Sequence, residues 1–263
     1  MDKSVIDLST NQMLLTYIFV ILAMIITSLN GLNRNKEFII GTIRMTAQLF
    51  LAGFVLVYIF DSSSLVLSIL MILLMEFFAI FNIVSSNKGQ LSKGMIGAIS
   101  ISLLIGSIFT LVFFLIVVVR PTPIYDPQYL IPLGGMIIGN SMTGINLALN
   151  QILKSIDTNR VNIEGSLMLG ATPRMAMDKI IQDAFDTAIT PSLNNIKNMG
   201  IINLPGMMTG QILGGVSPLI AIKYQIAIMT AILSSVTICV FFFLRLGYKK
   251  FFNEQGQLIR NQQ

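Results

Sequence analysis

The chain has 263 residues, of which 54% are hydrophobic and 11% charged, with a mean hydropathy of +0.79. Soluble domains carry roughly 25% charged residues, so this composition excludes an ordinary water-soluble protein and indicates a membrane protein. The sequence contains no histidine, which excludes the imidazole that usually binds zinc or shuttles protons. Its single cysteine, Cys239, excludes an intrachain disulfide.

Long apolar runs predict the fold. A helix needs about 20 apolar residues to cross a hydrocarbon core of roughly 30 Å, and backbone polar groups cannot stay unpaired in lipid. The runs are continuous rather than alternating, so we expect an all-α polytopic protein with about seven transmembrane helices in a single domain, residues 1–263. Pro205 and several glycines interrupt the sixth run. The runs are Met13–Leu29, Phe38–Phe60, Leu65–Val84, Met95–Val119, Leu130–Leu149, Met199–Val216 and Tyr224–Leu246.

The positions of lysine and arginine predict the orientation, because these residues concentrate in cytoplasmic loops. With seven spans, an N-terminus outside and a C-terminus in the cytoplasm, the outer connections hold Lys3, Arg120 and Lys223. Thirteen of the 17 lysines and arginines then lie in inner connections. The net charge of +5 is explained by this asymmetry, so it indicates no nucleic-acid partner.

One cytoplasmic connection, residues 151–198, is far longer than the others and has helical features of its own. Ile163–Gly170 is amphipathic and ends at a glycine, as helices often do. Thr172 and Pro173 then form an N-cap followed by a proline at the first helical position. Apolar residues recur at helical spacing after them, and Pro191 is expected to break or kink this second helix. The balanced charges of the loop favour docking of a protein over binding to a lipid surface.

The segment Glu164–Gly170 resembles the coupling motif of ABC-transporter permeases, in which a glutamate-led helix sits in a cleft of the cytosolic ATPase. The whole chain resembles more closely the small permease family typified by FetB, the membrane subunit of an iron-export ABC system. That family includes plant aluminium-tolerance half-transporters. The blocks that carry the likeness are 129–142, 164–174 and 204–215.

The resemblance implies a homodimeric permease in the bacterial cytoplasmic membrane that exports a metal cation such as iron. It also implies that a soluble ATPase subunit binds ATP and Mg and contacts the residues Glu164, Gly165, Ser166, Gly170 and Arg174. The chain lacks a phosphate-binding loop, because Lys88–Gly94 has the glycines and lysines in the wrong order. We therefore expect a transport subunit that binds no cofactor and is not an enzyme.

Glu76 is the one acidic residue inside a predicted span, and Arg44 lies in the preceding span. Ionisable groups inside a bilayer are costly and usually face a bundle interior, a partner or a pathway. Two interpretations stay open. Glu76 either pairs structurally with Arg44 or Gln48, or it serves the substrate pathway as a metal ligand or a proton acceptor.

The fifth and sixth runs share a pattern of glycines, amides and thioethers. Thioethers favour soft metals and amide oxygens harder ions, but methionine is also an ordinary packing residue. The candidate pathway residues are Met136, Asn140, Met142, Asn146, Met207, Met208 and Gln211. The glycines suit close helix packing, and they are Gly135, Gly139, Gly206, Gly210 and Gly214.

Two other functions stay open beside metal export. One is an ABC permease for a sugar nucleotide or a small organic solute, and the other is a self-contained channel or secondary carrier. The ABC functions predict co-purification with an ATPase, and the third predicts transport by this chain alone.

Overall fold

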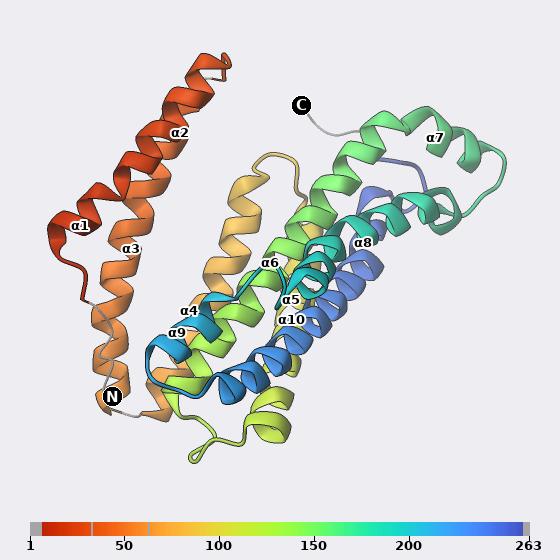
Figure 1. Cartoon of the computed structure of the whole chain (residues 1–263). Helices are drawn as coiled ribbons and strands as arrows, with labels where there is room; N and C mark the ends of the chain where they lie inside the picture. The colour runs from red at the N-terminus through yellow and green to blue at the C-terminus, as the bar shows by residue number, and fades with distance from the viewer. Residues whose placement is uncertain (1–6, 33, 63, 260–263) are drawn as a thin grey trace.

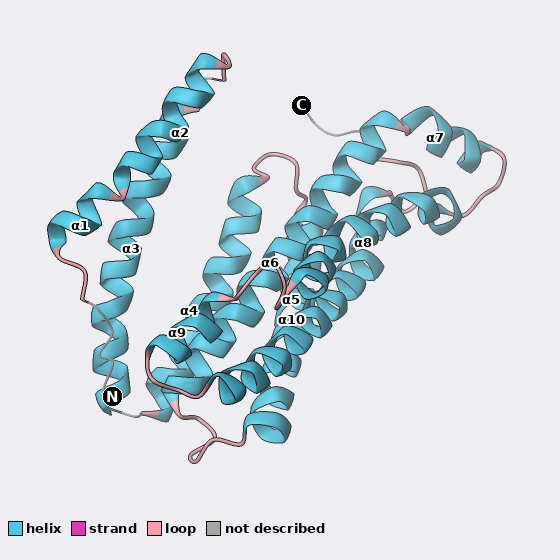
Figure 2. Ribbon diagram, in the orientation of Figure 1, coloured by secondary structure: helices cyan, strands magenta, loops and turns pink. Residues whose placement is uncertain are grey.

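A computed structural model describes residues 7–32, 34–62 and 64–259, and these ranges fold almost entirely into helices (Figures 1 and 2). This confirms the predicted all-α class. The α-helices are α1 (Thr10–Leu15), α2 (Tyr17–Leu29), α3 (Asn35–Ser62), α4 (Leu65–Ser86), α5 (Lys93–Phe113), α6 (Pro127–Thr158), α7 (Arg160–Met168), α8 (Pro173–Asn198), α9 (Gly206–Leu213) and α10 (Pro218–Gly247). A π-helix, η1 (Phe114–Val119), continues α5, and a 3-10 helix, η2 (Tyr248–Phe251), continues α10.

Five of the predicted runs lie in helices that suit a bilayer. Among the described residues, five helices are long and apolar enough to cross a membrane, namely Thr10–Leu29, Asn35–Ser62, Leu65–Ser86, Lys93–Val119 and Pro218–Phe251. The fifth run, Leu130–Leu149, lies in α6, whose 32 residues extend about 48 Å. Its amides and hydroxyls make it more polar than the five, although its length is ample for a crossing.

The prediction of a spanning helix over Met199–Val216 is wrong. Helix α9 has 8 residues and extends about 12 Å, which is too short to cross a bilayer. Pro205 occupies the position before the helix, and Gly214 caps its end. Gly215 follows with φ +91°, a left-handed conformation that terminates a helix and that glycine adopts without steric cost.

Helix α8 confirms the start of the predicted cytoplasmic element but differs from the prediction in two other respects. The Thr172 side chain accepts the Met175 N–H at 3.3 Å, which confirms the predicted N-cap. The helix then runs for 26 residues with Pro191 inside it, so a break at Pro191 is wrong, and a kink there stays a prediction. Instead of forming a separate loop, α8 packs lengthwise against α6 and α10 (Figure 1).

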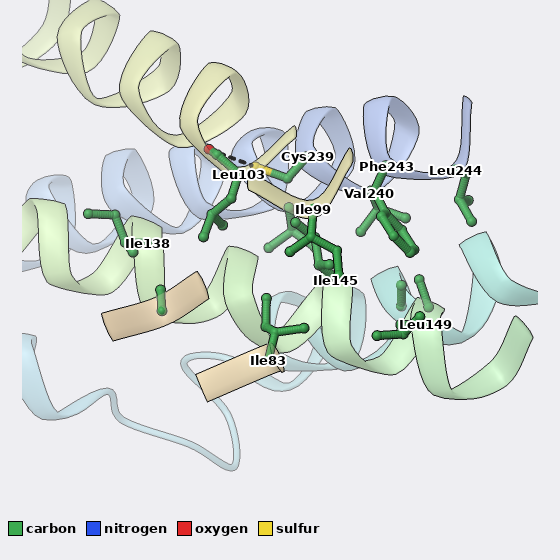
Figure 3. Close-up of a cluster of buried hydrophobic side chains, with 14 of the residues drawn as sticks. Ile83, Ile99, Leu103, Ile138, Ile145, Leu149, Cys239, Val240, Phe243 and Leu244 are labelled. Atoms are coloured by element: carbon green, nitrogen blue, oxygen red, sulfur yellow. Dashed lines mark hydrogen bonds between the residues drawn. The ribbon is translucent and has the colours of Figure 1, made fainter. Parts of the chain in front are cut away.

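Helices α4, α5, α6, α8 and α10 form one bundle with an aliphatic core. Figure 3 shows Ile83, Ile99, Leu103, Ile145, Leu149, Val240 and Phe243 converging from four of these helices. Three glycines permit the closest approaches. A Cβ at Gly106 would lie 2.3 Å from Cys239 Sγ, one at Gly134 would lie 2.5 Å from the Ile72 side chain, and one at Gly144 would lie 2.7 Å from Val236.

The N-terminal hairpin, α2 and α3, stands beside the bundle rather than within it (Figure 1). The apolar windows of its two spans are 0% and 6% buried, compared with 44% for the α10 span. Arg44 is exposed on α3. The hairpin therefore contributes little to the core in which the candidate site residues of α4 and α6 lie.

Candidate functional site

The predicted coupling motif forms a helical tip at one end of the molecule. Helix α6 extends beyond the bundle, and α7 turns back from its end (Figure 1). Glu164 is held by the Arg160 guanidinium, whose Nε lies 2.8 Å from its carboxylate. The Ser166 hydroxyl donates to the Asn162 carbonyl at 2.8 Å, and Gly170 has φ +90°. Gly165 lies inside α7, so four of the five predicted coupling residues share this tip.

Arg174, the fifth predicted coupling residue, lies at the start of α8. Its guanidinium carbon is 5.4 Å from the centroid of the Tyr248 ring, and the same side chain lies 3.7 Å from the Asp178 carboxylate. Cation–π contacts of this kind are worth roughly 0.5–1 kcal/mol at exposed sites. Arg174 therefore links the start of α8 to η2 at the C-terminal end of α10, and its role in coupling stays a prediction.

Apolar side chains dominate the outer surface of the tip. Val161, Met168 and Leu169 are 82%, 86% and 91% exposed. Sequence reasoning emphasised the glutamate and the glycines and passed over these residues, although Met168 and Leu169 lie inside the quoted motif. Exposed apolar groups at a protruding helical tip are typical of a docking surface for another protein.

Glu76 lies deep inside the bundle and is 1% exposed. The Ser107 hydroxyl of α5 donates to its Oε1. Its Oε2 is buried and has no hydrogen-bond partner among the described residues. Neither structural partner that we considered is found, because Arg44 and Gln48 are exposed on α3. Ser107 is the partner that the sequence did not reveal.

The surroundings of Glu76 are polar but hold few charges. The Ser141 and Ser235 hydroxyls lie 2.8 Å apart, and Ser235 also reaches the Gly106 carbonyl at 3.5 Å. Within residues 7–32, 34–62 and 64–259, no group of three acidic or cysteine side chains gathers that could hold a metal ion. The metal-ligand role of Glu76 thus stays a prediction.

We expect Glu76→Gln to abolish metal-stimulated transport without loss of folded protein. Glutamine retains the volume and one carbonyl oxygen for the Ser107 hydroxyl, but it cannot carry a negative charge or accept a proton at neutral pH. Transport into vesicles and the folded yield after purification measure the two effects. Ser107→Ala is the matched control, because it removes the partner and keeps the carboxyl. Unchanged transport by Glu76→Gln would exclude Glu76 as a ligand.

The candidate pathway residues of α6 are half-buried, on the two sides of its exposed face. Met136, Asn140 and Met142 are all half-buried, and the Asn140 amide donates to the Met136 carbonyl at 2.7 Å. Asn146 accepts from the Asn87 amide at 3.0 Å. Asn87 ends α4, so this pair ties α4 to α6 and was not foreseen from the sequence.

The other candidate pathway residues lie on α9 rather than on α6. Helix α9 packs against α10, with Met207 and Met208 half-buried. The Gln211 Oε1 atom is buried and lacks a hydrogen-bond partner in the described part of the chain. In the described part of the chain, α9 packs against α10, and the convergence of its methionines with those of α6 stays a prediction.

Among the described residues, the glycines predicted to pack helices make no close contact with another helix. A Cβ at Gly139, Gly206 or Gly210 would meet nothing within 4 Å, and one at Gly135 would meet Met75 at 3.8 Å. One at Gly214 would meet the carbonyl of Gly210 at 3.2 Å, within its own segment. A packing role for these glycines therefore stays a prediction that concerns a second copy of the chain.

Long apolar helices packed around an aliphatic core define this chain as a polytopic helical integral membrane protein. Residues 10–252 match the family described as "Uncharacterised protein family (UPF0014)", and the chain belongs to that family.

Three relatives illustrate the range of the family. The chain is 31% identical to the "Probable iron export permease protein FetB" of Escherichia coli (strain K12), over 97% of each chain. It is 34% identical to "Protein ALUMINUM SENSITIVE 3" of Arabidopsis thaliana, over 92% of this chain and 86% of the relative. It is 33% identical to the "UPF0014 membrane protein STAR2" of Oryza sativa subsp. japonica, over 91% and 82%. No solved structure matches the chain.

Proposed function

We propose that the chain is the membrane subunit of an ABC transporter in the bacterial cytoplasmic membrane and that it exports a metal cation such as iron. A second copy of the chain completes the permease, and a separate soluble subunit binds ATP and Mg. The likeness to a protein named as a probable iron export permease, over 97% of both chains, supports this proposal.

The observation that carries the ABC assignment is the exposed apolar tip of α7. Met168 and Leu169 are 86% and 91% exposed, and they immediately precede the turn at Gly170, on the same helical tip as Glu164. A partner whose cleft receives the tip would remove this apolar surface from water, which is worth roughly 25 cal/mol per Å². We infer that the ATPase is that partner.

The experiment reconstitutes the chain with its ATPase in liposomes and compares ATP turnover with Fe(II), Cu(I), Mn(II) and UDP-sugars. Selective stimulation by one metal is expected. Equal turnover with every compound would overturn the metal assignment, and selective stimulation by a UDP-sugar would favour the solute-transport function. Transport by the chain alone, without the ATPase, would identify a self-contained channel or carrier.

A further inference from the structure

Helix α8 lies beside α10 over nearly its whole length, and a contact at each end fixes its direction. Arg174, near the start of α8, lies over the Tyr248 ring, and the Gln225 amide donates to Met199 Sδ at 3.8 Å. The two helices are therefore antiparallel. The stretch of α10 between Gln225 and Tyr248 rises about 35 Å, which exceeds the roughly 30 Å of a hydrocarbon core.

The charged residues at the two ends of the α10 span mark its depth in the membrane. Lys223 lies just before the paired stretch, and Arg245, Lys249 and Lys250 lie at its inner end. Between them α10 is part of an apolar span with a mean hydropathy of 2.4. Because α8 runs alongside this stretch from end to end, α8 crosses the same depth. It thereby takes the place of the short α9 as the sixth crossing and preserves a cytoplasmic C-terminus.

One face of α8 is polar and exposed along this depth. We call Gln182, Asp186, Thr190 and Asn194 the α8 stripe. They recur every four residues and are all exposed, whereas Ile181, Ala184, Ala188 and Ser192 on the opposite side are buried. The Thr190 hydroxyl donates to the Asp186 carbonyl at 2.6 Å. Among the described residues, the Asp186 carboxylate forms no hydrogen bond or salt bridge, although it interacts electrostatically with Lys179 earlier on α8.

A lipid-facing surface of this protein looks different. On α4 and α5, the large exposed residues include Phe77, Phe81, Ile105 and Phe109. An aspartate at the centre of a spanning helix costs roughly 2.5–3.5 kcal/mol on insertion scales. The α8 stripe is therefore incompatible with hydrocarbon, and the Asp186 carboxylate, which no salt bridge neutralises, is incompatible with a dry interface.

The cytoplasmic end of the stripe opens into a cleft. Gln182 and Asp186 line a space of about 710 Å³ between α8 and α10, together with Arg174, Arg245 and Lys249. Charges of both signs at this mouth keep it hydrated. At the other end of α8, the Gln225 Oε1 atom is buried without a partner among the described residues. Polar groups thus continue along α8 from the cleft to the far side of the bundle.

We propose that the α8 stripe is one wall of a water-filled route through the membrane, along which a hydrophilic cargo passes. This inference rests on the proposed transport function. The α8 stripe belongs to residues 151–198, which the apolar runs had predicted to be a cytoplasmic connection. A second copy of the chain closes the route on its open side. Water and a hydrated cargo satisfy the stripe, which lipid would leave unsolvated.

Cysteine accessibility tests the wall directly, because the one native thiol, Cys239, is 0% exposed and the unmodified chain serves as the blank. Thr190→Cys and Asn194→Cys probe the stripe, and Ile105→Cys probes an exposed apolar position on α5. In sealed proteoliposomes, a charged methanethiosulfonate should modify both stripe variants at least tenfold faster than Ile105→Cys. A lipid-soluble maleimide should label all three, which shows that each thiol is present and reactive.

Two outcomes would contradict the proposal that the α8 stripe lines a water-filled route. Protection of both stripe variants to the level of Ile105→Cys would place the stripe against lipid or in a dry contact. Equal modification of all three would place α5 and α8 outside the bilayer. Neither measurement needs the ATPase, so the ABC assignment can survive either result.

A transport readout tests the route itself. After modification, ATP-driven export should fall at least tenfold in Thr190→Cys and Asn194→Cys, because the added group obstructs the cargo. Maleimide-labelled Ile105→Cys should keep its rate. Unchanged export by fully modified stripe variants would show that the α8 stripe is accessible to water but does not line the route of the cargo. Absence of any ATP-driven export by the unmodified chain would instead overturn the proposed function.

Discussion

If an ATPase is the partner that we propose, replacing Met168 and Leu169 together with alanine is expected to weaken its binding by at least about 30-fold, which corresponds to about 2 kcal/mol. These side chains are 86% and 91% exposed at the α7 tip, and fully desolvated apolar anchors dominate the energetics of protein interfaces. The folded core should be unaffected, because neither side chain contributes to it. Titration of the detergent-solubilised chain with purified ATPase measures the dissociation constant.

The matched control removes equally exposed apolar groups elsewhere. Ile201 and Ile202 are 89% and 82% exposed, but they lie in the segment between α8 and α9, far along the chain from the tip. Alanine at both positions should leave ATPase binding unchanged. Equal weakening by the two double variants would indicate a general loss of stability, and unchanged binding by the tip variant would contradict α7 as the docking element.

Composition and apolar runs were sufficient to predict the helical membrane fold, because continuous hydrophobicity over about 20 residues has few other physical explanations. The same criterion failed at Met199–Val216, and it does not indicate a crossing at α8, which we propose to cross the membrane. The first segment is apolar but is divided by Pro205, Gly214 and Gly215. The second is polar on one face, and its apolar face is buried against α6 and α10. Mean hydropathy cannot detect a crossing helix that protein and water shield from lipid.

Sequence reasoning predicted the local parts of the candidate site but not the contacts between its helices. The coupling residues form one local turn, so the sequence placed four of them together at the α7 tip. Glu76 was found because an acid in an apolar run is conspicuous. Its partner Ser107 and the Asn87–Asn146 pair join different helices, and only the packing of the bundle brings such residues together.

Substituting Gly106 with alanine is expected to destabilise the chain by about 1–3 kcal/mol, the usual cost of an overpacked core. The added Cβ would lie 2.3 Å from Cys239 Sγ and 2.9 Å from the Cys239 backbone nitrogen. Helices α5 and α10 must therefore separate, and their contact is central to the core. The apparent midpoint of thermal unfolding in detergent should fall by about 5 °C.

Gly97→Ala is the matched control, because it lies on the same helix and its Cβ would meet nothing within 4 Å. Alanine there should raise stability slightly, since glycine inside a helix costs about 1 kcal/mol relative to alanine. Adding Cys239→Ala to Gly106→Ala removes the sulfur contact but leaves the backbone contact, so the double variant should recover only part of the loss. Full recovery would show that the side chain alone sets the spacing of α5 and α10. An unchanged midpoint in Gly106→Ala would contradict their close packing, because two helices in that contact cannot accommodate a methyl group without moving apart.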